Sequence, residues 1–211
     1  MAFTYLLVDG ENIDATLGLS VLGRRPEPSE RPRWDRVRTF VDQDCAQAQS
    51  PEASDVEYDE EQGAEEPTPI RSAHSAALFF LNASNGSLPM NFVQALLAMD
   101  YRPIPLSGVG PEKVVDIGIQ RTLNAIADLP EGDVILASHD GDFIPQLERL
   151  LAAGRKVSVI CFREYLNSHL AALQDCGLKV YDIEHDIHAF REPLPRVRII
   201  PLAEFDPLQF I

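Results

Sequence analysis

The sequence has few cysteines and no long hydrophobic run, and both absences exclude classes of protein. Its three cysteines are Cys45, Cys161 and Cys176, and no two of them form a C-x-x-C pair. This spacing argues against a disulfide framework or a zinc knuckle and favours a reducing, cytoplasmic compartment. We expect Cys161 and Cys176 to be buried structural thiols.

The apolar runs are only as long as a β-strand, so we predict no membrane-spanning helix and no membrane partner. The N-terminal residues enter a strand without a basic segment, which is not the pattern of a signal peptide. A G-x-G-x-x-G fingerprint and a Walker loop are also absent. Hydride transfer and P-loop chemistry therefore rank low.

Basic residues are missing from one segment and concentrated in another. Residues 39–70 contain no Lys or Arg and ten Asp or Glu, so the net charge of −15 becomes about −5 without them. Residues 44–69 are acidic and poor in aromatics, and cannot bury enough apolar area to offset the entropy of ordering. We predict a disordered acidic insertion there, either a solvated spacer or a nucleic-acid mimic that covers the arginines.

Six arginines fall within residues 24–38. Arg24 and Arg25 follow the first predicted helix, so they could flank a site at its start and bind phosphate through their guanidinium groups. Pairing with nearby acids such as Glu27, Glu30 and Asp35 is the alternative.

Predicted strands and helices alternate along residues 1–183. The strands are expected at 3–8, 76–81, 101–106, 133–138, 156–161 and 179–183, and the helices at 13–22, 34–42, 90–99, 114–127, 143–153 and 166–175. Continuous apolar strands of this kind predict a parallel sheet covered by helices on both faces, a three-layer α/β/α Rossmann-like fold. Pro103 and Pro105 place the third strand at an edge. The proline-containing tail, 184–211, either packs on the body or pairs with a second copy in a homodimer.

The central stretch is Asp133–Phe143, D-V-I-L-A-S-H-D-G-D-F. Within this stretch, Asp140 and Asp142 directly follow a buried strand. They therefore lie at the edge of the sheet where open parallel sheets bind ligands. Two carboxylates about 5 Å apart repel by roughly 3 kcal/mol at an effective dielectric of about 20. A cation such as Mg²⁺ relieves that repulsion, whereas helix capping is the competing explanation. We expect His139, between these acids and the strand, to face solvent.

Two further aspartates can reach the same edge. Asp9 follows the first strand, and Asp116 opens the helix before the fourth strand. If the first and fourth strands are neighbours, Asp9 faces Asp140 and Asp116 approaches from the side. For Asp116 alone, a first-turn acid favoured by the helix dipole is the alternative.

Three motifs, taken in order, resemble the NYN domain, a PIN-like nuclease fold, and in particular its bacterial LabA-like branch. They are V-D-G-E-N at 8–12, K-V-V-D-I-G-I at 113–119 and A-S-H-D-G-D-F at 137–143. The resemblance covers about residues 4–183 and implies a sheet order of 3-2-1-4-5.

The resemblance also implies Mg²⁺- or Mn²⁺-dependent cleavage of RNA. The family's metal-binding and catalytic acids fall here on Asp9, Asp116, Asp140 and Asp142. Asn12 matches the motif asparagine, which would orient Asp9 or bind a phosphate, and Ser138 matches a small hydroxyl residue. Lys113 could contact a phosphate or lie solvated on the surface.

One departure from the pattern favours a second hypothesis. Many relatives carry another acid where this sequence has Thr122. A catalytically weak or inactive RNA-binding or protein-interaction module is therefore the alternative to a ribonuclease. A Toprim-like phosphoryl-transfer site ranks third, because it expects a glutamate where Asp9 stands.

Overall fold

The computed structural model describes residues 3–47, 75–109, 112–195 and 205–209. Most of the predicted acidic insertion, residues 48–69, lies outside the described residues, and so the predicted disorder stays a prediction there.

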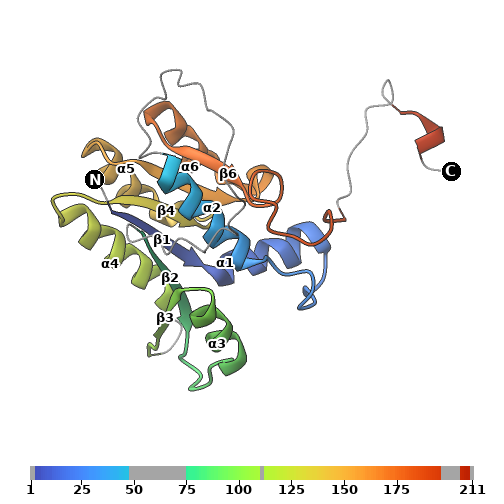
Figure 1. Cartoon of the computed structure of the whole chain (residues 1–211), viewed down its shortest axis with the longest axis horizontal. Helices are drawn as coiled ribbons and strands as arrows, with labels where there is room; N and C mark the ends of the chain where they lie inside the picture. The colour runs from blue at the N-terminus through green and yellow to red at the C-terminus, as the bar shows by residue number, and fades with distance from the viewer. Residues whose placement is uncertain (1–2, 48–74, 110–111, 196–204, 210–211) are drawn as a thin grey trace, which may run out of the picture.

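Six parallel strands form one sheet in the order β3-β2-β1-β4-β5-β6, with helices on both faces (Figure 1). The strands are β1 Thr4–Asp9, β2 Ser75–Asn82, β3 Tyr101–Leu106, β4 Asp133–Ala137, β5 Val157–Cys161 and β6 Lys179–Asp182. The predicted three-layer α/β/α fold and the order of its first five strands are confirmed, and β6 extends the sheet beyond β5. The proline-containing β3 lies at the edge, as predicted.

The helices and helical turns are α1 Gly10–Thr16, η1 Leu17–Leu22, α2 Trp34–Gln47, α3 Met90–Ala98, α4 Val114–Asp128, η2 Gly141–Phe143, α5 Ile144–Ala152, η3 Arg163–Tyr165, α6 Ser168–Ala172, η4 Leu173–Cys176 and η6 Pro207–Gln209. Alternate residues of β1 enter different cores, because successive strand side chains point to opposite faces. Leu6 and Val8 pack with α1, α2 and α3, whereas Leu7 packs with α4, α5 and α6.

Two helices differ from their predicted extents. The helix predicted at 13–22 is present, but it begins three residues earlier, at Gly10, and its second half, Leu17–Leu22, is the π-helix η1. The second continues to Gln47, so the insertion predicted to begin at residue 44 begins with a helical turn. Tertiary contacts hold that turn: Cys45 is buried, and Tyr181 donates its hydroxyl to Asp44 Oδ1 at 2.9 Å.

The part of the tail directly after β6, residues 183–194, packs on the body, whereas residues 205–208 are exposed. Ile187 and Phe190 are buried in the same core as β1. Arg36 donates to the carbonyls of His188 and Phe190 at 2.6 and 2.8 Å. The hydrophobic core therefore reaches past residue 183, and the predicted homodimer through the tail stays a prediction.

Within the described ranges, no helix combines the length and apolarity needed to cross a bilayer. Cys161 is buried as expected, and burial raises the pKa of its thiol to about 12. The expectation for Cys176 is wrong, because this thiol is exposed on η4.

Candidate acidic site at the carboxyl ends of the strands

Asp9 ends β1 and is almost completely buried, with 2% of its surface exposed. It caps α1: the backbone N–H of Asn12 donates to Oδ1 at 3.1 Å, and the Ser138 hydroxyl donates to Oδ2 at 3.2 Å. Burial raises the pKa of Asp9 to about 6, and the charges of Asp116 and Asp140 add to this effect against the two hydrogen bonds. The predicted proximity of Asp9 to these two acids is therefore present in the fold.

Asp140 and Asp142 follow β4, the neighbour of β1. Asp140 caps η2, because its Oδ1 accepts the backbone N–H of Asp142 at 2.9 Å. The backbone N–H of Asp140 donates to Ser138 Oγ at 3.2 Å, so one serine connects this loop to Asp9. Helix capping thus explains why an aspartate stands at position 140, because its Oδ1 is the cap. It does not explain the aspartate at position 142.

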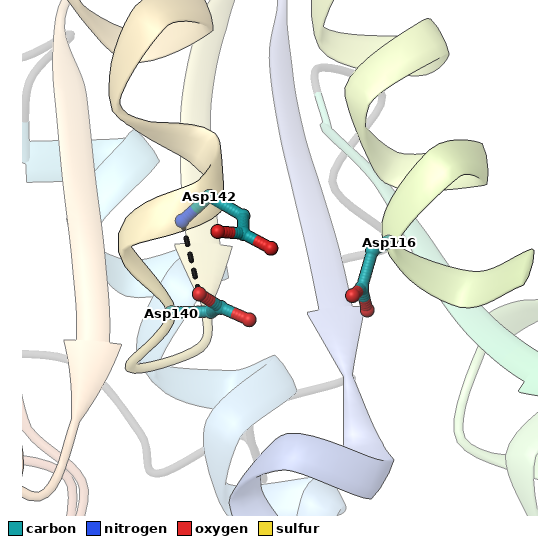
Figure 2. A group of neighbouring side chains, drawn as sticks. All are labelled: Asp116, Asp140 and Asp142. Carbon is teal, nitrogen blue, oxygen red and sulfur yellow. Dashed lines mark hydrogen bonds between the residues drawn. The ribbon is translucent and has the colours of Figure 1, made fainter. Parts of the chain in front are cut away.

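Asp116, in the first turn of α4, points across the end of β1 toward these two aspartates (Figure 2). Oxygen atoms of Asp116, Asp140 and Asp142 all lie within 4.8 Å of one another. Asp116 and Asp140 are half-buried and Asp142 is exposed, so the cluster opens to solvent on one side. Three predicted ligands thus converge, and Asp9 lies beneath them, outside the mutual 4.8 Å limit.

The donor set fits a hard divalent cation. Mg²⁺ takes oxygen ligands at about 2.1 Å, so two opposite ligands lie about 4.2 Å apart, and coordinated waters complete the shell. Adjacent ligands lie about 3.0 Å apart, so oxygen atoms spaced within 4.8 Å would have to move closer together to hold one such ion. Mg²⁺ and Mn²⁺ both suit all-carboxylate sites, and a thiol- or imidazole-preferring ion does not.

Lys113 already places a positive charge at this cluster. Its Nζ lies 3.3 Å from Asp116 Oδ2 and 3.2 Å from Asp142 Oδ2, and the contacts raise the pKa of the ammonium group. The lysine side chain is two-thirds exposed, so it can move away without unpacking the core. A cation and the ammonium group would therefore compete for the same carboxylate oxygens.

His139 is buried, so the expectation that it faces solvent is wrong. Its Nε2 accepts the backbone N–H of Phe162 at 2.8 Å, which leaves the proton on Nδ1. That Nδ1–H lies 2.9 Å from Asn12 Oδ1, which also accepts the backbone N–H of His139. Burial lowers the pKa of His139 to about 4, and the ring stacks on Phe162.

Asn12 therefore connects the start of α1 to the loop after β4. Its backbone N–H binds Asp9 Oδ1, while its side-chain oxygen binds His139 and not Asp9. The described residues provide no hydrogen-bond acceptor for its Nδ2 amide. This amide is the group of Asn12 that remains for a ligand.

The arginines of residues 24–38 largely bind acids and backbone. Arg24 forms a two-point ion pair with Glu30 at 2.5 and 2.7 Å, and Arg33 pairs with Asp35. Arg25 is exposed. For Arg24 the structure thus contains the predicted alternative to phosphate binding, an ion pair with a nearby acid.

Thr122 does not replace the missing family acid at the cluster. Its hydroxyl donates to the Gly118 carbonyl at 2.8 Å, within α4. Gln120, on the same helix, donates from Nε2 to the carbonyl of Asp142 at 3.1 Å. Sequence analysis missed Gln120, whose position one turn after Asp116 was the available signal.

Asn167 was also missed. It caps α6, accepting the backbone N–H groups of His169 and Leu170, and lines a shallow hollow beside Asp140 and Asp142. A Cβ added to Gly141 would lie 2.8 Å from Asn167 Nδ2, so a larger residue between the acids would displace the side chain that caps α6. The capping pattern Asn-Ser-His before an apolar helix was the sequence signal.

Fold and cluster together define an α/β protein with an acidic site at the carboxyl ends of its central parallel strands. No family model matches the sequence, and no curated protein matches it. A solved structure of a protein of unknown function from Vibrio parahaemolyticus superposes with a TM-score of 0.57 and 18% identity, over 88% of this chain and 94% of that chain. At this level of identity the likeness shows the fold alone.

Proposed function

We propose that the chain is a divalent-metal-dependent ribonuclease, as the resemblance to the NYN domain implies. The observation that supports this most is the convergence of Asp116, Asp140 and Asp142 from two separate elements to within 4.8 Å. Like charges that gather in this way, above a fourth buried acid, create a negative potential that a cation offsets. A bare carboxylate cluster would repel RNA, so the cation is part of the proposal.

Mg²⁺ or Mn²⁺, when bound, supplies Lewis-acid stabilisation of phosphate oxygens and lowers the pKa of water. Asp116, Asp140 and Asp142 would hold the cation, and the buried Asp9 would add its negative charge to the site. Ser138 orients Asp9 and the loop of Asp140 through its two hydrogen bonds.

The remaining groups act on the substrate in this proposal. Lys113 leaves the carboxylates and pairs with a phosphate oxygen of the RNA. The Nδ2 amide of Asn12 donates to the sugar–phosphate backbone of the same RNA. Arg25, which is exposed, contacts a more distant phosphate, and Arg24 does so only if it leaves Glu30. We also propose a cytoplasmic location, in keeping with free thiols at all three cysteines.

Cleavage of a labelled single-stranded RNA, with Mg²⁺, with Mn²⁺ and with EDTA, tests the proposal. Asp140→Asn is the test variant. Asp128→Asn is the matched control. Asp128 is the last residue of α4, whereas Asp116 lies in its first turn, so the two aspartates are about 18 Å apart along the helix at 1.5 Å per residue. Metal-dependent products from wild type and Asp128→Asn, lost in Asp140→Asn, are expected; metal-independent products equal in all three proteins would contradict the proposal.

The second candidate is an inactive RNA-binding or protein-interaction module of the same fold. Two observations favour it: Lys113 neutralises part of the cluster, and Thr122 offers no carboxylate to the site. Calorimetry with Mn²⁺ separates the two candidates, since the module needs no metal affinity.

A further inference from the structure

An apolar pocket lies on the face of the sheet opposite α4, at the same carboxyl-terminal edge as the aspartates. Its walls come from α1, the 23–33 loop, the start of α2, β2 and α3, and its apolar side chains include Trp34, Phe79, Leu81, Phe92 and Met99. Gly10 and Glu11 line the pocket and directly follow Asp9. Because consecutive Cα atoms are about 3.8 Å apart, the pocket wall begins within one residue of the acidic site.

Gly10 is necessary for this wall. A Cβ at this position would lie 2.5 Å from Phe79 Cζ, so only glycine lets α1 start this close to the ring. Phe79 packs edge-on against Trp34 and Phe92, at centroid distances of 5.1 and 5.3 Å. The aromatic wall is therefore held in place by its own contacts.

The pocket mouth carries hydrogen-bonding groups of both kinds. Asp14 Oδ2 lies 3.3 Å from Arg31 Nε, which places an acceptor beside a donor, and the Asn91 amide offers one of each. Among the residues that line the pocket, the two carboxylates of Glu11 and Asp14 outnumber the one guanidinium group of Arg31, which disfavours a phosphate inside the pocket. A flat neutral heterocycle with apolar faces and a polar edge matches both the walls and the mouth.

We propose that this pocket binds the base of the nucleotide next to the phosphate held at the aspartates. The assignment rests on the proposed ribonuclease function. It means that the protein recognises two parts of the RNA, the phosphate at the aspartates and the base in the pocket. The RNA strand crosses the edge of the sheet at Asp9 and Gly10, with its phosphate over the acids and its base against the aromatic wall. Bases bind aromatic surfaces in this way with little dependence on sequence.

The single tryptophan of the chain, Trp34, lines the pocket and provides a direct probe. The indole N–H resonance of ¹⁵N-labelled full chain is followed in EDTA during titration with adenosine, guanosine, cytidine or uridine. Saturable movement of this resonance is expected with nucleosides and not with ribose 5-phosphate. Arg31→Ala is expected to weaken the apparent affinity about tenfold, the effect of losing one charge-assisted hydrogen bond.

Arg121→Ala is the matched control, an exposed arginine on α4 across the sheet, and it should bind nucleosides as wild type does. A resonance that stays unmoved with every nucleoside, or equal affinities in wild type and Arg31→Ala, overturns the pocket assignment. The titration needs neither metal nor cleavage. Nucleoside binding without RNA cleavage therefore refutes the ribonuclease proposal separately, whereas cleavage with an unmoved Trp34 resonance refutes the pocket.

Discussion

Replacing Asp9 by asparagine is expected to stabilise the metal-free protein near neutral pH. The pKa of Asp9 is raised from 3.8 to about 6, chiefly by burial, so keeping this carboxylate ionised opposes folding. Each unit of difference between the folded and unfolded pKa of a group is worth about 1.4 kcal/mol. For Asp9 the difference is about two units, so its ionisation costs the folded protein about 3 kcal/mol at pH 7. An amide keeps one of the two accepted hydrogen bonds and loses about 1 kcal/mol with the other, which leaves a net gain of about 1–2 kcal/mol.

The sign of the pH dependence follows from the raised pKa. The folded protein binds the Asp9 proton more tightly than the unfolded chain, so the stabilising contribution is complete below pH 3.8 and is lost as the pH rises through 6. Asp9→Asn lacks this loss. Its advantage over wild type should therefore be absent near pH 4 and should grow up to pH 7.

Urea unfolding in EDTA at a series of pH values measures this difference, with Asp128→Asn as an exposed control whose ion pair contributes at most about 1 kcal/mol. Repeating the series with Mn²⁺ should reverse the order, because ligand at about a hundredfold over Kd adds about 2.7 kcal/mol to the protein that binds it better. An Asp9→Asn protein that is less stable than wild type at pH 7 in EDTA would refute the reasoning. It would show that the hydrogen bonds of Asp9 outweigh its burial.

Three further predictions concern neighbouring residues. Lys113→Met, which removes the ammonium group between Asp116 and Asp142, should raise Mn²⁺ affinity about tenfold by calorimetry, a change of about 1.4 kcal/mol; an unchanged affinity would mean that the ammonium does not compete. Asn12→Ala should lower the free energy of unfolding by about 1–3 kcal/mol, since it removes the acceptor of the His139 backbone N–H and leaves the ring Nδ1–H, among the described residues, only Thr16 Oγ1, 3.3 Å away, and a loss below about 0.5 kcal/mol in urea unfolding would contradict this. His139 should stay neutral by NMR until the pH falls toward 4; its lowered pKa contributes stability above pH 6.5 that is lost as the pH falls through about 4, and a midpoint near 6.5 would argue against its burial.

The sequence was sufficient for the fold because its signals are local and repeat along the chain. Continuous apolar strands alternate with amphipathic helices, and the two prolines of β3 mark an edge. The proximity of Asp116, Asp140 and Asp142 was also predictable, because β4 ends, and the helix that leads into it begins, at the same edge of a parallel sheet.

What the sequence did not reveal depends on tertiary contacts. A histidine in a polar loop is usually solvated, but His139 is buried because Asn12 and the Phe162 backbone satisfy both ring nitrogens. Arg36 belongs to the arginine-rich segment 24–38, and it holds the chain after β6 through two carbonyls. The pairings of Asn12 with His139 and of Arg36 with the chain after β6 join residues more than a hundred positions apart, which periodicity and spacing do not encode.

The position of β1 in the middle of the sheet has a consequence for folding during synthesis. Its partner on one side, β2, follows in the first half of the chain, but the partner on the other side, β4, begins only at residue 133. A growing chain that has reached β3 therefore presents one unpaired edge of β1, a template for pairing with another chain. Insertion of β4 closes that edge and, in the same step, carries Asp140 to Asp9, so protection from aggregation and assembly of the acidic site are a single event.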